Sequence, residues 1–297
     1  NSIKIQIIIP KETYLDGNYK YGNYKIQTVR KLRKLAYLTD KKLLRLKKFS
    51  QKYKINITAS IFGLESLRKA SILNPLYYKI ASGDLNNKEL IDETIKKKRK
   101  IILSTGMSTE REINRTINYL KKKKFNNFVI MHCVSEYPHE TEKSQLGFLK
   151  KLNNYGIEIG FSDHSLNSSS AVVAVSMGIK WIEKHFTLSK NLGGLDAKHS
   201  MEPKELKNYI DEIRGIEKSL QNKKRVLTKA EIKTMQRARR SFFVSKDLKK
   251  NHKITREDLL IVRPYKRVDI WDIDKFLGKK LKISLKKNKI IKAKHLK

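Results

Sequence analysis

Serine, histidine and glutamine side chains recur where short runs of β-branched and aromatic residues end. Such groups offer hydrogen bonds to a polar ligand. One polar side chain at the end of a strand is an ordinary loop cap, but seven successive strand ends that carry them favour a functional rim. In a barrel of alternating strands and helices, catalytic and binding residues meet at this rim. The residues of the pattern are Gln6, Ser60, Ser82, Ser104, His132, Ser135, Ser162, His164 and His185.

The elements that must position these side chains are seven predicted strands separated by helical patterns. Thr109 to Glu112 form a capping box, and Pro203 suits the first turn of another helix. This alternation predicts a parallel sheet or barrel. Because a closed barrel has eight units and the first run begins at Asn1, we expect an α/β fold, a (β/α)8 TIM barrel that lacks its first βα unit. The predicted strands are 2–9, 55–61, 77–81, 100–104, 127–133, 157–162 and 181–187.

A second, smaller domain is predicted at the carboxyl end of the chain. The stretch 223–240 is polar and basic and is interpreted as a linker. After it the pattern changes to short β-rich runs with intervening turns. We therefore expect a barrel domain over 1–222 and a small β-rich domain over 241–297, with strands at 241–244, 259–262 and 280–285.

The charge of the chain invites a nucleic-acid hypothesis. Lysine and arginine number 67 against 29 acidic residues, a formal net charge of +38. The lysines are scattered over predicted helix faces and turns, whereas nucleic-acid sites usually cluster them near aromatic platforms. The chain is also rich in Ile and Asn, which share A/T-rich codons with Lys, so genome bias explains the excess. Nucleic-acid binding is the less favoured alternative.

Cysteine usage and hydropathy indicate the compartment in which the protein works. Cys133 is the only cysteine, which excludes an internal disulfide and a cysteine-rich zinc site and fits a reducing compartment. No run approaches the ~20 apolar residues of a membrane span. The first predicted strand starts at once, without a signal peptide. We expect a cytoplasmic protein with no membrane partner.

Five strings of the chain occur in the order, and near the spacing, of one enzyme family. The chain resembles the sialic acid synthases, also called N-acetylneuraminate synthases, which include the legionaminic and pseudaminic acid synthases. The strings are KIASGDLNN (79–87), ILSTGM (102–107), HCVSEYP (132–138), GFSDHS (160–165) and IEKHFT (182–187). The carboxyl-terminal part resembles the antifreeze-like (SAF) domain of these enzymes through RRS (239–241), KDL (246–248), VRP (262–264) and LGKK (277–280).

The resemblance implies the condensation of phosphoenolpyruvate with an open-chain N-acetyl-hexosamine, most simply N-acetylmannosamine. The product is a nine-carbon 2-keto acid, and phosphate is released. Phosphate and carboxylate groups require positive charge and directional donors. The residues that the resemblance assigns to phosphoenolpyruvate are Lys4, Ser60, Lys79, Ser82, Ser104, Ser135 and Ser162.

The resemblance also implies a metal ion and a sugar site. His164 and His185 correspond to ligands of a divalent ion, Mn²⁺ first, with Mg²⁺ or Co²⁺ as alternatives. By themselves, two histidines this far apart indicate core residues more often than a metal site. Tyr137, Asp196 of the Gly194-Leu195-Asp196 string, and Gln6 correspond to catalytic and sugar-binding positions, with Asn23 as an addition. In the family, Arg263 reaches the sugar pocket of the partner in a domain-swapped homodimer.

Several positions depart from the family pattern. The Glu-Ile-Gly-x-Asn-His string of the first strand does not occur, which leaves a catalytically silent remnant or scaffold as an alternative. Thr-Pro-Phe-Asp is replaced by 60–63, which keeps a hydroxyl and has Gly63 in place of the carboxylate. Asp84 stands for Glu and Ser135 for Asn. Residues 265–267 replace the Gly-Asn-Gly that follows Arg-Pro, so the identity of the sugar is the least transferable property.

Overall fold

The structure is a computed structural model that describes residues 1–193, 195–221 and 224–297. The chain divides into two compact units, Asn1–Gln221 and Asn222–Lys297. The expected boundary between 222 and 223 falls outside the described residues. Each unit has a hydrophobic core of its own.

The first unit contains a seven-stranded parallel sheet whose strands lie in the order of the chain, β1-β4-β5-β6-β7-β8-β9. This confirms the barrel-like α/β fold predicted from the alternating pattern. Among the described residues, β1 and β9 are the edges of this sheet. The strands are β1 (Ser2–Gln6), β4 (Asn56–Ile61), β5 (Tyr77–Ile80), β6 (Lys100–Ser104), β7 (Phe128–Cys133), β8 (Glu158–Asp163) and β9 (Trp181–Lys184).

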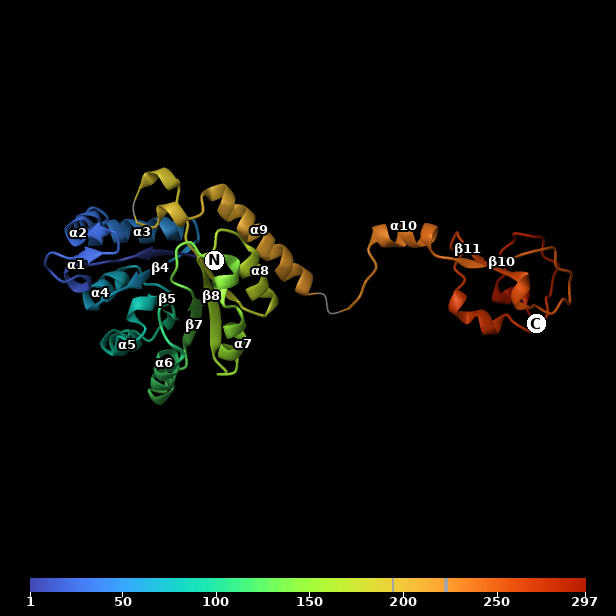
Figure 1. Ribbon diagram of the computed structural model, residues 1–297, viewed down its shortest axis with the longest axis horizontal. Helices are drawn as coiled ribbons and strands as arrows, with labels where there is room; N and C mark the ends of the chain where they lie inside the picture. The colour runs from blue at the N-terminus through green and yellow to red at the C-terminus, as the bar shows by residue number, and fades with distance from the viewer. Residues whose placement is uncertain (194, 222–223) are drawn as a thin grey trace. The chain divides into compact units, whose positions relative to one another are not determined.

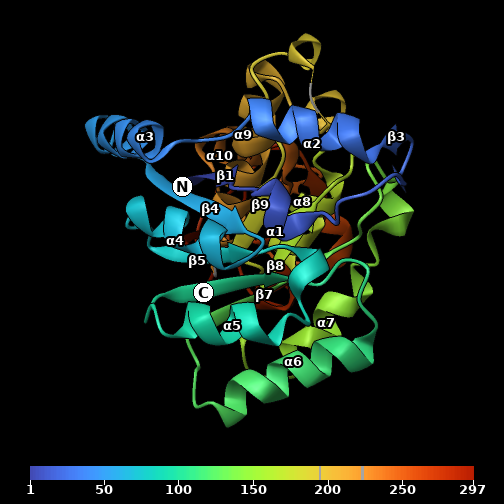
Figure 2. The ribbon, with the colours of Figure 1, turned by 90° about the vertical axis from the view of Figure 1, so that its left-hand side faces the viewer.

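Helices follow the strands and pack around the sheet (Figures 1 and 2). Apolar residues from strands and helices form one core, in which Ile61, Ile101 and Phe161 are fully buried. The helices of the unit are α1 (Pro10–Thr13), α2 (Ile26–Leu35), α3 (Asp40–Lys52), α4 (Leu64–Ile72), α5 (Lys88–Ile95), α6 (Glu110–Lys122), α7 (Gly147–Asn153), α8 (Ser169–Ser176) and α9 (Pro203–Leu220). A short hairpin of β2 (Lys20–Tyr21) and β3 (Tyr24–Lys25) precedes α2.

Local sequence signals fix several of these boundaries. Thr109 caps α6: its hydroxyl accepts from Glu112 N, and the Glu112 carboxylate accepts from Thr109 N at 2.7 Å. Pro203 opens α9 as predicted. The two edge strands are shorter than expected, because β1 ends at Gln6 before Pro10 opens α1, and β9 ends at Lys184 where Phe186 forms only an isolated bridge to Met201.

The second unit holds an antiparallel pair, β10 (Ser241–Val244) and β11 (Leu259–Val262), preceded by α10 (Lys229–Ala238). The strand expected at 280–285 is wrong. Leu281 N donates to His252 O, Lys282 N to His295 O and Leu285 N to Leu248 O. Since successive residues bond to different segments, they make isolated bridges and no continuous ladder.

Short 3-10 turns complete the two units: η1 (Ser82–Asp84), η2 (Thr141–Ser144), η3 (Lys190–Leu192), η4 (Ala197–His199), η5 (Arg256–Asp258), η6 (Ile270–Lys275) and η7 (Ala293–His295). Within the described parts of the chain, no helix has the length and apolar character needed to cross a membrane.

Candidate active site

A cavity of about 430 Å³ runs along the inside of the sheet between its two edge strands. Ser2, Tyr77 and Trp181 line one end, where the strands begin. His185 and Asp196 line the other end, beyond the point where β9 stops. The cavity therefore leads to the rim that the sequence pattern singled out.

Glu183 is the centre of a charged cluster inside the sheet. Its Oε1 lies 3.1 Å from Lys4 Nζ and 3.2 Å from Lys79 Nζ, and it accepts a hydrogen bond from Ser162 Oγ at 3.0 Å. Lys79 Nζ also donates to Ser104 Oγ. Strands β1, β5, β6, β8 and β9 thus bring two cations, one anion and two hydroxyls together, with a net charge of about +1.

The protonation of this cluster follows from its environment. Burial by itself raises the pKa of Glu183, but Lys4 and Lys79 outweigh it and hold that pKa well below its usual range. Burial lowers the pKa of Lys79, which Glu183 counteracts. Glu183 is therefore ionised at neutral pH and holds the two lysines close together.

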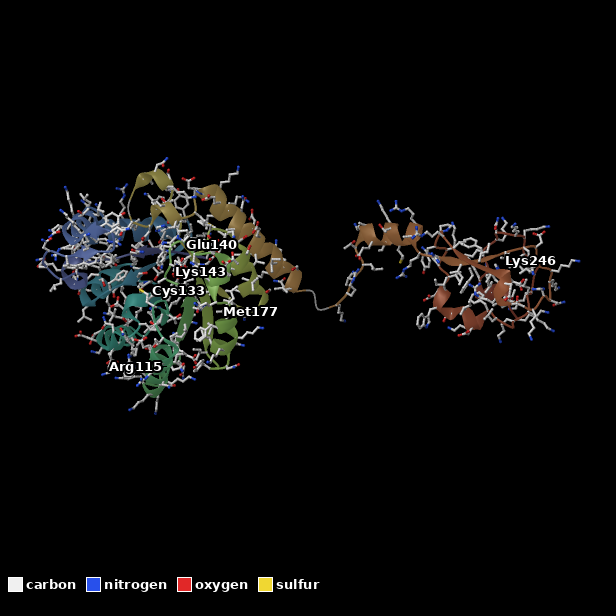
Figure 3. The ribbon with its side chains drawn as sticks, viewed as in Figure 1. Arg115, Cys133, Glu140, Lys143, Met177 and Lys246 are labelled. Carbon is white, nitrogen blue, oxygen red and sulfur yellow. The ribbon has the colours of Figure 1, made fainter. Side chains whose placement is uncertain are left out.

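A group of small polar side chains surrounds Gly106 next to this cluster. Gly106 N donates to Ser82 Oγ at 3.1 Å, and Ser82 Oγ lies 3.2 Å from Cys133 Sγ. A Cβ at Gly106 would lie 2.1 Å from Ser135 Oγ and 2.9 Å from Ser82 Oγ. The glycine is required here for space, because the backbone approaches both hydroxyls. Figure 3 marks Cys133 in the first unit.

His164 and His185 lie side by side at the rim, with ring centroids 5.4 Å apart. His164 Nδ1 lies 2.7 Å from Val134 O. A carbonyl only accepts, so Nδ1 carries the proton, and Nε2 keeps its lone pair on the side of Ser162 Oγ, 3.4 Å away. Burial lowers the pKa of His164 to about 4 and also lowers the pKa of His185. Both rings are neutral at pH 7.

Tyr137 covers the histidine pair. Its ring centroid lies 4.2 Å from that of His164, 6.0 Å from that of His185 and 5.9 Å from that of His199. Burial raises the pKa of Tyr137 to about 12, so its hydroxyl stays protonated. Close by, Gln6 Nε2 donates to Asp196 Oδ2 at 3.2 Å. The rim therefore joins a phenol, imidazoles, an amide and a carboxylate.

Two known families match the chain. The NeuB family matches residues 1–225, and the SAF domain matches residues 239–297. The chain belongs to the NeuB family. A NeuB relative in Campylobacter jejuni, an N,N'-diacetyllegionaminic acid synthase, is 33% identical over 246 residues, which are 82% of this chain and 74% of the relative. The pseudaminic acid synthase of the same species is 33% identical over 229 residues, 77% of this chain and 66% of that protein.

A solved structure shares the fold of this NeuB chain. It is the N-acetylneuraminic acid synthetase of Leptospira borgpetersenii in complex with citrate, with a TM-score of 0.67 and 32% identity. The match covers 79% of each chain. Thus the family and the fold class expected from the sequence, a barrel-like α/β sheet followed by a SAF domain, are confirmed.

Most residues predicted for the site of this NeuB chain converge in its first unit. Ser60 is buried on β4, in register with Gln6 and Lys79. Arg263 follows β11 in the second unit, and Gly194 lies outside the described residues. Asn23 occupies the exposed turn between β2 and β3.

Three site residues escaped the sequence analysis or changed role. Glu183 was overlooked although it stands two residues before His185 and is the register partner of Ser162. A carboxylate at an inward position of a buried strand was the feature of the sequence that could have identified it. His199 had no such signal. His132 is a core residue, because it is buried against Phe148 and its Nε2 lies 2.8 Å from Ser144 O.

The carboxylate missing at Gly63 is supplied by another segment of this NeuB chain. Glu12 of α1 accepts hydrogen bonds from Glu65 N at 2.6 Å and Ser66 N at 3.1 Å, at the first turn of α4. A Cβ at Gly63 would lie 2.8 Å from Glu12 Cδ. The side chain of Glu12 therefore occupies the place that a side chain at position 63 would take.

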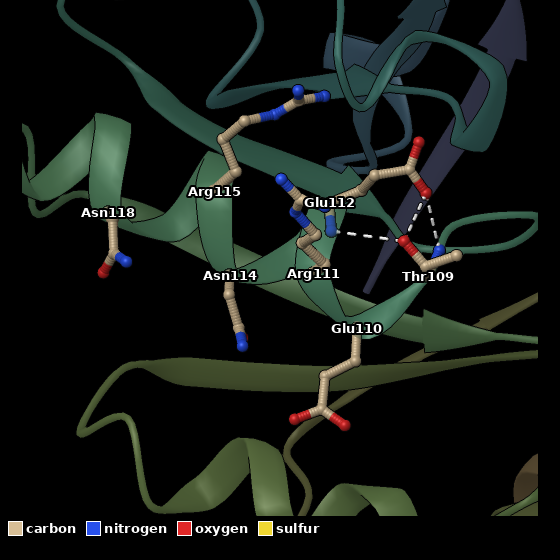
Figure 4. Close-up of a pocket in the computed structure, with 7 residues that line it drawn as sticks. All are labelled: Thr109, Glu110, Arg111, Glu112, Asn114, Arg115 and Asn118. Carbon is tan, nitrogen blue, oxygen red and sulfur yellow. Dashed lines mark hydrogen bonds between the residues drawn. The ribbon is translucent and has the colours of Figure 1, made fainter.

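A second depression, of about 970 Å³, lies over the first turns of α6 (Figure 4). It is lined by Thr109, Glu110, Arg111, Glu112, Asn114, Arg115 and Asn118. Its prominent groups are the capping pair Thr109 and Glu112, with Arg111 and Arg115 on neighbouring turns. Glu110 forms an ion pair with Lys151. Because these residues belong to the helix layer outside the sheet, this depression is no part of the site.

Proposed function

We propose that this protein condenses phosphoenolpyruvate with an N-acetylated amino sugar in its open-chain form. The methylene carbon of phosphoenolpyruvate bonds to the aldehyde carbon, the oxygen of a water molecule ends on C2, and inorganic phosphate leaves. The product is a nine-carbon 2-keto acid. The arrangement that carries this proposal is the Lys4–Glu183–Lys79 cluster together with the hydroxyls of Ser104 and Ser162 that bond to it. Relatives named as legionaminic and pseudaminic acid synthases favour this function over a silent remnant or a nucleic-acid binder.

The anion-binding end suits the phosphate and carboxylate groups of phosphoenolpyruvate. Two lysines with one carboxylate leave positive charge for a ligand, and hydroxyls add directional donors. The side chain of Lys79 is 3% exposed, so its attraction for an anion is little screened by water. We assign Lys4, Lys79, Ser60, Ser82, Ser104, Ser135 and Ser162 to this ligand.

The donor set at the rim fits a divalent metal ion. His164 donates its Nδ1 proton to a backbone carbonyl, the outer contact typical of a metal-binding imidazole, and so offers Nε2. Across the described ranges, no group of three or more His, Cys, Asp or Glu side chains has the geometry of a metal site. His164 and His185 would therefore be two ligands of an open site, with Mn²⁺ the first candidate. A metal ion there would polarise the aldehyde oxygen.

The sugar end is assigned to Gln6, Tyr137 and Asp196. The Gln6–Asp196 hydrogen bond presents an amide and a carboxylate to hydroxyl groups, while the neutral Tyr137 hydroxyl donates. We propose that Arg263 of the SAF domain completes this end from the partner in a domain-swapped homodimer, and that the enzyme works in the cytoplasm. In that arrangement the N-acyl group of the sugar would meet a loop that carries the positive charges of Lys266 and Arg267.

The test is phosphate release from phosphoenolpyruvate by the metal-free protein, with and without Mn²⁺. We expect no release without sugar, and loss of release in Lys79→Met. His164→Ala and His185→Ala should lose both activity and Mn²⁺ binding. Release that persists at the wild-type rate in the double histidine variant contradicts the metal assignment, and no release with any sugar contradicts the enzyme function.

The same assay separates the sugars. N-acetylmannosamine, the substrate expected from the sequence, is compared with the deoxy di-N-acetyl sugars that lead to legionaminic and pseudaminic acids. The preferred sugar is the one with the highest kcat/KM. Sedimentation at several protein concentrations tests the homodimer, and Arg263→Ala should raise the KM for the sugar and leave that for phosphoenolpyruvate unchanged.

A further inference from the structure

A buried polar cluster lies on the outer face of the sheet, between β8, β9 and α9. Asp163 is its centre and is fully buried. Its Oδ2 accepts from Lys184 Nζ at 3.0 Å and from Tyr209 OH at 2.9 Å. Its Oδ1 accepts from Ser165 N at 2.9 Å and Ser165 Oγ at 2.7 Å. A carboxylate has about four acceptor positions, and all are filled.

The cluster ties three elements to each other. Asp163 and Lys184 are register partners at the ends of β8 and β9. Tyr209 comes from α9, is 4% exposed, and its ring lies 5.2 Å from Lys184 Nζ. Lys184 Nζ also donates to Ser165 O, in the loop after β8. Because each side chain of this cluster has hydrogen-bond partners within the protein, the arrangement favours one geometry of the two strand ends.

The two imidazoles of the rim follow this cluster directly. Successive side chains of a strand face opposite sides. Ser162 and Glu183 contact each other inside the sheet, and Asp163 and Lys184 face α9. The next residues along each strand, His164 and His185, return to the inside, where their rings lie 5.4 Å apart. The spacing of the rings therefore depends on how the strand ends are held.

We propose that Asp163, Lys184 and Tyr209 are positioning residues that set the spacing of His164 and His185 for the metal ion. This inference rests on the metal site of the proposed function. Tyr209 is the link through which α9 holds both strand ends. The polar atoms of the three side chains bond to one another and to the loop after β8.

The test is calorimetric titration of Mn²⁺ into the metal-free full-length chain. Tyr209→Phe removes one hydroxyl and keeps the ring. Tyr119→Phe is the matched control, since Tyr119 OH donates to Asp92 Oδ1 at 2.6 Å in a contact between α6 and α5 that involves neither β8 nor β9. We expect Mn²⁺ to bind about tenfold more weakly in Tyr209→Phe, the scale for contacts behind metal ligands. Tyr119→Phe should bind as the wild type does, and high Mn²⁺ should restore phosphate release in Tyr209→Phe.

Each outcome decides between the proposals. If the wild type binds Mn²⁺ through His164 and His185 and Tyr209→Phe binds it equally well, the positioning proposal is wrong. If both tyrosine variants weaken Mn²⁺ equally, general destabilisation is the cause and the proposal is wrong. If the wild type does not bind Mn²⁺, the metal site itself fails. Ser165→Ala removes one donor of the same cluster and gives a second measurement if Tyr209→Phe does not fold; unchanged Mn²⁺ affinity there overturns the proposal.

Discussion

Glu12 caps α4, and this contact predicts that the effect of a substitution at Gly63 on stability changes sign when Glu12 is removed. Glu12→Ala leaves the backbone N–H groups of Glu65 and Ser66 without the carboxylate that accepts from both. Loss of a cap costs about 1 kcal/mol of unfolding free energy. For a unit of this size, about 1 kcal/mol lowers the Tm by roughly 2–4 °C.

Gly63→Asp is expected to have opposite effects in two backgrounds. The backbone of Gly63 is extended, with φ of 172°, so an aspartate adopts it without strain. In the wild type its Cβ would lie 2.8 Å from Glu12 Cδ, and two carboxylates would compete for one helix terminus. We expect destabilisation of about 1 kcal/mol or more. In Glu12→Ala the space is free, and the introduced aspartate caps α4 and restores most of the lost stability.

The assay is scanning calorimetry of the full chain, following the transition of the first unit in the four proteins of this double-mutant cycle. Glu112→Ala is the control background, because it removes the carboxylate half of the α6 capping box and leaves Gly63 beside Glu12. There Gly63→Asp should destabilise as it does in the wild type. Equal effects of Gly63→Asp with and without Glu12 would falsify the cap exchange.

Three further changes test the site. Glu183→Gln leaves two lysines without their carboxylate, so urea unfolding should show that the free energy of unfolding falls by about 3 kcal/mol. This is the low end for a broken buried pair, because a fifth of the Glu183 side chain is exposed. Unchanged stability contradicts the role of Glu183 in the cluster. Burial lowers the pKa of His164 from 6.5 to about 4. Between these two pH values the unfolded chain binds a proton at this residue and the folded chain does not. The contribution of the neutral His164 to the free energy of unfolding is therefore fully present above pH 6.5 and falls by up to about 1.4 kcal/mol per pH unit toward pH 4. In metal-free buffer the free energy of unfolding of His164→Asn should fall less steeply over that range than that of the wild type. An identical slope contradicts the lowered pKa of His164. Gly106→Ala places a methyl group 2.1 Å from Ser135 Oγ, so the KM for phosphoenolpyruvate should rise about tenfold or more, a cost of about 1.4 kcal/mol; a wild-type KM shows that the hydroxyls do not bind this ligand.

Local patterns explain why much of the fold was predictable. A capping box such as Thr109 with Glu112 involves neighbours three residues apart, so its sequence identifies the helix start. The seven strand runs were found because buried parallel strands are short apolar stretches. The strand predicted at 280–285 was wrong because these residues form three separate backbone contacts in the small domain. The alternation of apolar and polar residues does not by itself identify a partner strand.

The sequence by itself determined the order of strands and helices, the polar residues at the strand ends and the family. Only the tertiary structure decided which of those residues act together. Glu183 meets Lys4 and Lys79 across separations of more than 100 residues along the chain, and Glu12 fills the place beside Gly63 from another helix. Such contacts depend on the packing of whole elements, because an ion pair or a cap requires only that two groups meet in space, whatever their distance along the chain.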